Sequence, residues 1–299
     1  MSDRSFLSYA QNREDYHLAL LFEGEPPGFY VDVGGGHPVA DNVSFHFYER
    51  GWRGLIVEPQ PRLAAAYARV RPRDIVVSAL VGRQEGVAAF YEMEEFHGLS
   101  TTVAANAAAS AERGLASRER RVPVATLAGL CAAHAPARID FLKIDVEGAE
   151  ADVIAGNDWT RLRPRIVVVE SVTPWSMADA SPAFAPMLAA AGYRDVLFDG
   201  LNRFYLAGEA AALAGRLPAA PIDWGAMRHL GELGPPRDNP AHPDHALARL
   251  LPGDILGRLN DLPDAALAAL LPAGVDPASA ETRAALARIA AFHDGGYVG

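Results

Sequence analysis

The sequence has 299 residues, of which 50% are hydrophobic and 21% are charged, so it encodes a globular protein with a sizeable core. Its formal net charge of −10 disfavours non-specific binding to nucleic acid or to an anionic membrane, because like charges repel. The sequence has a single cysteine, which predicts a reduced, cytoplasmic protein. It has no basic leader followed by an apolar run and no apolar run of about 18 residues, so no signal peptide and no membrane span are expected.

The N-terminal residues predict a polar loop followed by one amphipathic helix. Polar residues dominate positions 8–16, and the apolar run 17–22 ends before Gly24 and two prolines, which stop helices. The ordinary interpretation is a helix packed across one face of a sheet. The loop also holds more polar side chains than a helix cap needs, so Gln11 is predicted to contact a ligand.

Residues 29–50 predict a strand, a glycine turn and a helix. The apolar run 29–33 carries Asp32 near its carboxyl end, three glycines follow at 34–36, and an amphipathic helix is expected from Asn42 to position 50. Glycines lack a β-carbon, so a ligand can approach their N–H groups closely, and the helix N-terminus adds partial positive charge. A small charged ligand is expected there, although a glycine cluster alone is often only a turn.

A second predicted strand, residues 55–57, ends at Glu58. A carboxylate in this position can accept hydrogen bonds from the two hydroxyls of a ribose. The turn reads Gly-Gly-Gly-His-Pro-Val and lacks the third glycine of Gly-x-Gly-x-x-Gly, which lets a helix pack under a dinucleotide pyrophosphate. The two features together disfavour NAD and favour a nucleoside without a diphosphate, above all S-adenosylmethionine.

The middle of the chain alternates between strand and helix patterns, which predicts a parallel sheet. The expected elements are a helix at 62–69, a strand at 75–80, a hairpin turn at 82–86 leading into a strand at 87–91, and a helix at 127–134 that buries Cys131. Residues 94–121 have no strand signal and are expected to form a lid or a substrate loop.

Two further strands are expected at 139–144 and 165–170, and both are apolar enough to be covered on two faces. A helix at 183–191 follows, and residues 194–199 and 203–206 form a closing β-hairpin. The predicted fold is therefore α/β, a doubly wound and mostly parallel sheet of about seven strands with an antiparallel hairpin at its edge.

The composition changes beyond residue 210. Ten of the 22 prolines lie there, no strand signal remains, and the clearest helical pattern is 280–292. We therefore expect an S-adenosylmethionine-binding domain at 1–210 and a helical, Pro-rich C-terminal extension at 211–299. The extension could pack on the core, mediate homo-oligomers or cap the substrate cleft.

Acidic residues lie at or next to the carboxyl ends of five predicted strands. Ligands of open α/β sheets bind above those ends, so the acids point to one cleft. They are Asp32, Glu58, Asp145, Glu170 and Asp199. A single acid at a strand end is often a helix cap or a salt-bridge partner, but five together are harder to explain in that way.

If the ligand is a methyl-donating sulfonium, a hydroxyl acceptor benefits from a base or a Lewis-acidic cation beside it. Asp145 is the best-placed base or metal ligand, followed by Glu147 and Glu170, with His37 as a competitor. Lys143 precedes Asp145 by two residues and points to the same side of the sheet, where it could tune that acid. A divalent cation on Asp145 and Glu170 suits carboxylate chemistry, but no recognisable spacing supports it.

Five runs of sequence, in order between about residues 6 and 207, closely resemble the FkbM family of S-adenosylmethionine-dependent methyltransferases. They are residues 8–15, 28–38, 47–59, 141–150 and 198–205. The resemblance implies a class I methyltransferase fold and O-methylation of a hydroxyl. The branch that the chain resembles most accompanies bacterial glycan synthesis, which implies a sugar hydroxyl as the acceptor.

The same resemblance assigns residues to roles. It places Asp32, Gly34, Gly36 and Glu58 in the cofactor motifs, and Asp145 with Glu147 in the Asp-Val-Glu-Gly element of the family. Gly35 and Asn42 are also predicted to bind the cofactor. At the position of Gly35, relatives often have alanine.

Two alternatives stay open at this point. The first is a methyltransferase for a polyketide or peptide acceptor, which would share the cofactor half and differ in the cleft. The second is a non-catalytic nucleotide-binding scaffold, in which the acids are structural and the Pro-rich extension docks a partner.

Overall fold

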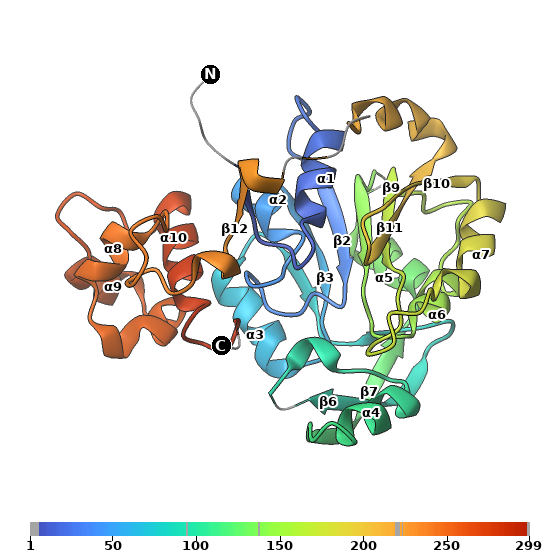
Figure 1. Cartoon of the computed structure of the whole chain (residues 1–299), viewed down its shortest axis with the longest axis horizontal. Coiled ribbons are helices and arrows are strands. Elements are labelled where there is room, and N and C mark those ends of the chain that lie inside the picture. The colour runs from blue at the N-terminus through green and yellow to red at the C-terminus, as the bar shows by residue number, and fades with distance from the viewer. Residues whose placement is uncertain (1–5, 94, 137, 219–221, 223, 298–299) are drawn as a thin grey trace.

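The computed structural model describes residues 6–93, 95–136, 138–218, 222 and 224–297. Its centre is a seven-stranded sheet in the order β10-β11-β9-β8-β2-β3-β4 (Figure 1). The strands are β2 (Phe29–Val33), β3 (Arg53–Val57), β4 (Ile75–Val77), β8 (Phe141–Ile144), β9 (Ile166–Glu170), β10 (Tyr193–Phe198) and β11 (Asn202–Ala207). The five strands from β9 to β4 are parallel, and β11 is antiparallel to both β9 and β10. The predicted α/β class with a mostly parallel sheet is confirmed.

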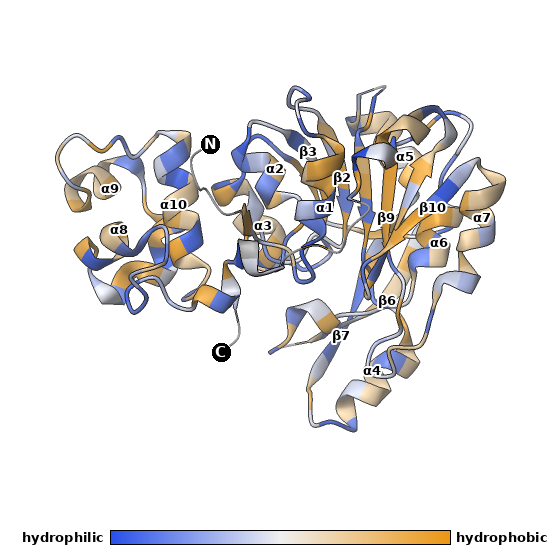
Figure 2. Cartoon of the chain, turned by 45° about the horizontal axis from the view of Figure 1, so that its top comes forward, coloured by the Kyte–Doolittle hydropathy of each residue, from blue (hydrophilic) through white to orange (hydrophobic). Residues whose placement is uncertain are grey.

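The central strands β2, β8 and β9 are buried along their whole length. Their runs of β-branched and aromatic residues suit strands that are covered on both faces, and the main sheet is largely hydrophobic in Figure 2. Tyr30 of β2 stacks on Phe141 of β8, with ring centroids 5.4 Å apart. Phe22 and Phe47 pack against the same Phe141 ring, which fixes the N-terminal helices on this face.

Helices connect and cover the strands. They are α1 (Glu14–Leu21), α2 (Phe45–Glu49), α3 (Pro61–Val70), α4 (Ala104–Ala111), α5 (Leu127–His134), α6 (Glu150–Ala155) and α7 (Ala185–Ala190). Pro61 occupies the first turn of α3, where its missing N–H costs nothing, and Thr126 caps α5 by accepting the N–H of Gly129. Cys131 of α5 is a free, buried thiol, as predicted.

A second, three-stranded sheet corrects the prediction for residues 75–121. The expected strand 75–80 breaks after Val77, and the chain leaves the main sheet to form β5 (Leu80–Val81). Both β5 and β6 (Gly86–Met93) pair with β7 (Ser117–Ala125), so the expected hairpin across 82–86 is wrong. Residues 117–121 are part of a strand although their sequence, Ser-Arg-Glu-Arg-Arg, is polar, because this part of β7 is largely exposed.

The residues beyond 210 contain a short strand, which corrects the expectation that none would occur there. β12 (Met227–His229) pairs in parallel with β1 (Phe6–Ser8), in a segment that was expected to be a loop. The extension continues through α8 (His245–Leu250), α9 (Asp264–Leu270) and α10 (Ala280–Ala290), which gather at one end of the molecule (Figure 1). Their leucines form a separate apolar cluster, and Ala287 and Ala291 also pack against Phe45 of α2.

Helices of the described residues are all too short or too polar to cross a membrane.

Candidate functional site

A cavity of about 370 Å³ lies at the carboxyl ends of β2, β3 and β8. The chain runs from β2 to β3 on one side of the sheet, whereas β8 lies on the other side of β2, so the strand order reverses at this point. Such a reversal leaves a crevice between the diverging connections, and ligands of open α/β sheets bind there.

The glycine turn forms one wall of this cavity. Gly34 has φ +80°, and a Cβ there would lie 1.7 Å from the main-chain oxygen of Asp145, so only glycine fits. Gly36 has φ +59° and open space on its Cα, which leaves room for a ligand. The N–H groups of Gly34, Gly35 and Gly36 all bind acceptors within the protein, namely Val57 O for the first two and Glu58 for the third. The turn therefore offers bare backbone surface, and its N–H groups are not free for a ligand.

Asn42 and Tyr67 hold the turn from behind. The side-chain amide of Asn42 and the Tyr67 hydroxyl both donate to the carbonyl of Gly35, at 2.9 and 2.6 Å. Asp32 lies on the same side and accepts the hydroxyl of Ser44 at 2.5 Å. Asp32 and Asn42 therefore support the turn and do not line the cavity.

A buried arginine joins these supporting residues. The Arg71 guanidinium donates to Asn42 Oδ1, Ser44 Oγ and the Tyr30 hydroxyl, each at 2.9 Å. Its charge is balanced by Asp74 at 2.7 Å, and both side chains are completely buried. The position of the glycine turn thus depends on a charged network below it.

Glu58 follows β3 and is hydrogen-bonded directly to the glycine turn. Its Oε2 accepts the N–H of Gly36 at 2.8 Å and its Oε1 accepts the N–H of Gln60 at 2.7 Å. Burial raises the pKa of this carboxyl to about 8, against the opposing effect of the two N–H donors. Each carboxylate oxygen has a second lone pair, so Glu58 can still accept a hydrogen bond from a ligand.

Apolar side chains line the cavity beyond Glu58. They come from the β5 region, from β6 and from the helical turn His97–Leu99, and they are Ala79, Leu80, Val81, Phe90, Phe96 and Leu99. His97 lies among them without a charge at neutral pH, because burial lowers its pKa to about 4. This part of the cavity suits a flat, weakly polar group.

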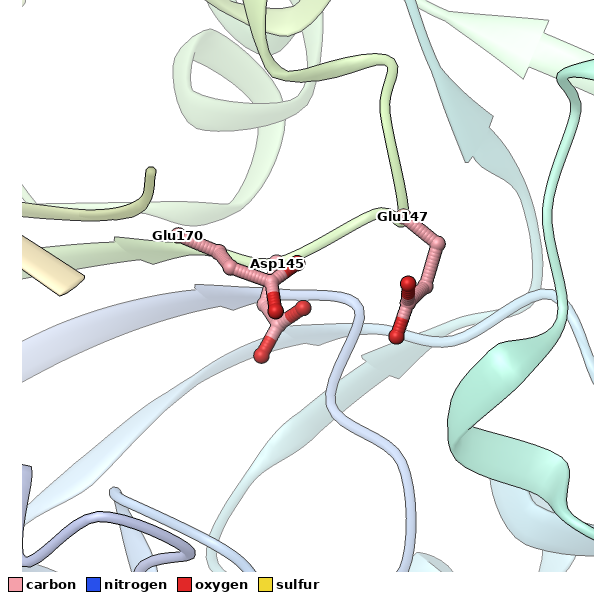
Figure 3. A group of neighbouring side chains, drawn as sticks. All are labelled: Asp145, Glu147 and Glu170. Carbon is pink, nitrogen blue, oxygen red and sulfur yellow. The ribbon is translucent and has the colours of Figure 1, made fainter. Parts of the chain in front are cut away.

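Carboxylates occupy the opposite end. Asp145 and Glu147 line the cavity, and Glu170 at the end of β9 lies beside them (Figure 3). Burial raises the pKa of both Glu147 and Glu170, and the negative charge of Asp145 raises it further. This end of the cavity can accept hydrogen bonds from hydroxyls or bind a positive charge.

Lys143 supplies the nearest cation in this region. Its Nζ donates to Asp145 Oδ2 at 3.1 Å and to Asn202 Oδ1 at 2.8 Å, and Asn202 in turn donates to Glu14 at 2.6 Å. Burial lowers the pKa of Lys143, but the charges of Asp145 and other nearby acids outweigh it and raise the pKa overall. Lys143 is the single lysine of the sequence, against 26 arginines.

His37 is held at the other side of the turn. Its Nδ1 accepts the N–H groups of Val39 and Ala40, and its Nε2 lies 3.2 Å from Asp294 Oδ1. Both ring nitrogens are therefore engaged inside the protein. Gly296 and Tyr297, which follow Asp294, also line the cavity.

The structure brings most of the residues predicted from sequence to this cavity. Those that line it are Gln11, Gly34, Gly35, Gly36, His37, Glu58, Asp145 and Glu147. The others, Asp32, Asn42, Lys143 and Glu170, lie behind the cavity wall and contact residues that line it or each other. Asp199 lies outside the cavity, where its carboxylate accepts the N–H groups of Leu201 and Asn202 and closes the β10–β11 turn.

Sequence reasoning missed two groups of residues that shape the site. Arg71 and Asp74 were not predicted, because one buried arginine does not stand out among 26. Gly296 and Tyr297 were missed because they are the last described residues of an extension that has no motif of its own. Asn202 could have been found, since it lies in the run 198–205 that resembles the family.

Comparison with known proteins gives a family for this arrangement. The sequence profile of the methyltransferase FkbM domain matches residues 32–194, which begin in β2 and end in β10. No curated protein matches the chain. The matched residues include the glycine turn, Glu58 and the three neighbouring carboxylates, and they make up more than half of the 299 residues. The chain therefore belongs to the FkbM family of methyltransferases.

Proposed function

We propose that this methyltransferase transfers a methyl group from S-adenosylmethionine to a hydroxyl oxygen, and that the acceptor is a sugar of a glycan or of a glycosylated metabolite. The observation that carries this proposal is the presence of Glu58 and the carboxylates Asp145 and Glu147 in one cavity, on either side of the glycine turn.

The cavity fits a nucleoside. Its volume of about 370 Å³ lies in the range of roughly 300–1,000 Å³ that is usual for small-molecule sites. Glu58 provides acceptors for ribose hydroxyls, and the apolar residues beyond it, among them Leu80 and Phe90, provide a surface for an adenine ring. Gly36 leaves the space between these groups free of side-chain atoms.

S-adenosylmethionine, when bound, supplies an electrophilic methyl group: a C–O bond forms to the acceptor, the C–S bond breaks with its electron pair returning to sulfur, and the hydroxyl proton is released. Asp145 is suited to accept that proton, because its carboxylate reaches the cavity and its side chain is 29% exposed. Lys143 holds Oδ2 of Asp145 and so orients the other oxygen. His37 is not assigned this role, since both of its ring nitrogens are engaged.

A sugar acceptor is supported by the number of polar side chains around the cavity. Gln11, Asp41, Asp145 and Glu147 all line it. Several acceptors close together suit a molecule with several hydroxyls, since each buried hydroxyl needs a hydrogen-bond partner. An apolar polyketide would leave these groups unsatisfied.

We further assign residues 1–210 to the cofactor-binding domain and residues 211–299 to an extension that completes its wall. Gly296 and Tyr297 line the cavity, which supports this role for the extension. The main core continues a few residues past this boundary, since Leu213 packs in it.

The test measures cofactor binding and transfer separately. Calorimetry with S-adenosylhomocysteine should show binding to the wild type and a loss of affinity in Glu58→Ala, with the exposed Glu85→Ala as the matched control. Equal affinity in wild type and Glu58→Ala would remove Glu58 as the ribose ligand, and no binding to the wild type would remove S-adenosylmethionine as the donor.

Labelled S-adenosylmethionine should then transfer its methyl group to members of a panel of nucleotide sugars and oligosaccharides. Polyketide and peptide acceptors are tested alongside this panel, and transfer to them alone would replace the sugar proposal. Absence of transfer to any acceptor, with cofactor binding intact, would favour the non-catalytic alternative.

A further inference from the structure

Three carboxylates from two parts of the fold meet beside the cavity. Glu170 ends β9, Asp145 follows β8, and Glu147 lies in the loop that leads to α6 (Figure 3). One oxygen from each side chain lies within 4.8 Å of the other two. Like charges at this separation repel each other strongly in a partly buried site.

Within the described part of the chain, Glu170 lacks a hydrogen-bond partner for one of its two carboxylate oxygens. Its side chain is 9% exposed, and its Oε2 is a buried atom without a hydrogen-bond partner among the described residues. A buried carboxylate oxygen without a partner is costly. The described hydrogen bonds of Lys143 Nζ go to Asp145 and Asn202 and not to this oxygen. The Glu170 side chain points into the cluster, so the group that it lacks would lie there.

We propose that Asp145, Glu147 and Glu170 together bind one divalent cation of the Mg²⁺ and Mn²⁺ type. Mg²⁺ binds oxygen ligands at about 2.0–2.1 Å, so its ligands lie roughly 3–4 Å apart. One oxygen from each of the three carboxylates lies within 4.8 Å of the other two, so small rotations of these side chains would bring all three to one ion. Coordination positions that the protein leaves open are available to water or to an acceptor.

The protein holds two of these ligands in place before an ion arrives. Lys143 donates to Oδ2 of Asp145, so the other oxygen of that carboxylate is directed away from the lysine. Glu147 has φ +55°, a costly conformation for a residue with a side chain, and two donors fix it there. The Thr101 hydroxyl and the Asn106 amide both donate to the Glu147 carbonyl at 2.8 Å.

The role of the ion rests on the proposed function. An acceptor hydroxyl bound to a hard cation loses its proton more readily, which makes its oxygen a better nucleophile. With the ion bound, the oxygen of Asp145 that Lys143 leaves free would be one of its ligands, and the hydroxyl proton would pass to water in the cavity. A sugar with two neighbouring hydroxyls could occupy two open coordination positions, which would orient it towards the glycine turn.

Binding of Mn²⁺ to the full chain tests the site without relying on activity. After treatment with a chelator, the wild type should bind one Mn²⁺ per chain by electron paramagnetic resonance, and Mg²⁺ should compete. Glu170→Gln and Glu147→Gln should each weaken Mn²⁺ binding at least about tenfold, because each removes a charged ligand. Asp152→Asn, which neutralises an exposed acid of the following helix, is the matched control and should bind Mn²⁺ like the wild type.

Two results would overturn the site: no saturable Mn²⁺ binding to the wild type up to millimolar concentration, or unchanged binding in both glutamine variants. Circular dichroism checks that each variant is folded, and if Glu170→Gln is not, the more exposed Glu147→Gln carries the comparison. Calorimetry with S-adenosylhomocysteine on the same preparation separates the two proposals. Cofactor binding without Mn²⁺ binding would remove only the cation site, and the reverse result would remove only the proposed donor.

Discussion

His37 Nε2 lies 3.2 Å from Asp294 Oδ1, so the glycine turn near the start of the chain is joined directly to the end of the C-terminal extension. Because Nδ1 of His37 accepts two backbone N–H groups, the ring proton is on Nε2 and is donated to Asp294. Arg62 of α3 also donates to the main-chain oxygen of Asp294 at 3.0 Å. The glycine turn and α3 therefore both hold the segment that carries Tyr297 to the cavity.

Replacing Asp294 should weaken cofactor binding although this residue does not line the cavity. Asp294→Ala removes the acceptor for His37 and for the N–H of Gly296, so the segment with Gly296 and Tyr297 loses one attachment, while the bond from Arg62 to the main-chain oxygen remains. Loss of one or two hydrogen bonds of this kind is worth about 1 kcal/mol, and we expect the Kd for S-adenosylhomocysteine to rise about three- to tenfold. Calorimetry measures this change. The control is Asp276→Ala, an exposed turn residue of the same extension, and equal Kd values for the two variants would contradict the role of the attachment.

The central strands of the sheet could be predicted from sequence because burial on both faces restricts which residues they can contain. Strands buried on both faces need mostly apolar residues, and residues 29–33, 139–144 and 165–170 have them. β7 could not be predicted, because an exposed strand needs no apolar residues and its Ser-Arg-Glu-Arg-Arg run resembles a loop. β1 and β12 were missed for a different reason. Each is three residues long and forms only by pairing with the other across most of the chain.

The candidate site was predictable where its residues follow strands. Glu58 and Asp145 come directly after β3 and β8, and sheet topology then brings them to one edge. The position of Asp32 in its strand does not reveal that it faces Ser44 and not the cavity, because that depends on how α2 packs. Tyr297 has no such relation to the sheet, and only tertiary packing of the extension brings it to the cavity.

Arg71 should be essential for stability, in contrast to a neighbouring arginine. Arg71→Met leaves the buried Asp74 carboxylate without its cation, and breaking a buried ion pair in this way costs about 3–5 kcal/mol. Urea denaturation measures the loss in the free energy of unfolding. Arg69→Met is the control, because Arg69 also has an aspartate partner but both side chains are nearly half exposed, and it should cost less than about 1 kcal/mol. Similar losses in the two variants would show that the network around Arg71 is not what fixes the glycine turn.

Glu58 should make cofactor binding depend on pH. Burial raises its pKa to about 8, so the carboxyl of the free protein is protonated below that pH and can accept hydrogen bonds from ribose hydroxyls fully only above it. The affinity for S-adenosylhomocysteine should therefore rise as the pH increases from 6 to 8 and then level off. At the lower pH, binding of the ligand should release the proton of the Glu58 carboxyl. Calorimetry in buffers of different ionisation enthalpy measures that release. Glu58→Gln cannot titrate and should bind more weakly with a flatter profile; a profile like that of the wild type would assign the titration to another group.

Lys143 should act through its shape as well as its charge. Its ammonium fits between Asp145 Oδ2 and Asn202 Oδ1, at 3.1 and 2.8 Å, and both Lys143 and Asn202 are buried. Arginine keeps the charge, but its planar guanidinium is larger and cannot place one donor at both sites, so Lys143→Arg should misplace Asp145. We expect turnover to fall at least about tenfold in Lys143→Arg and in Lys143→Met, because Asp145 loses its orientation, while the Kd for S-adenosylhomocysteine changes less than about threefold. Steady-state kinetics and calorimetry measure the two quantities separately. Full turnover in Lys143→Arg, together with loss of turnover in Lys143→Met, would show that a positive charge alone is sufficient beside Asp145.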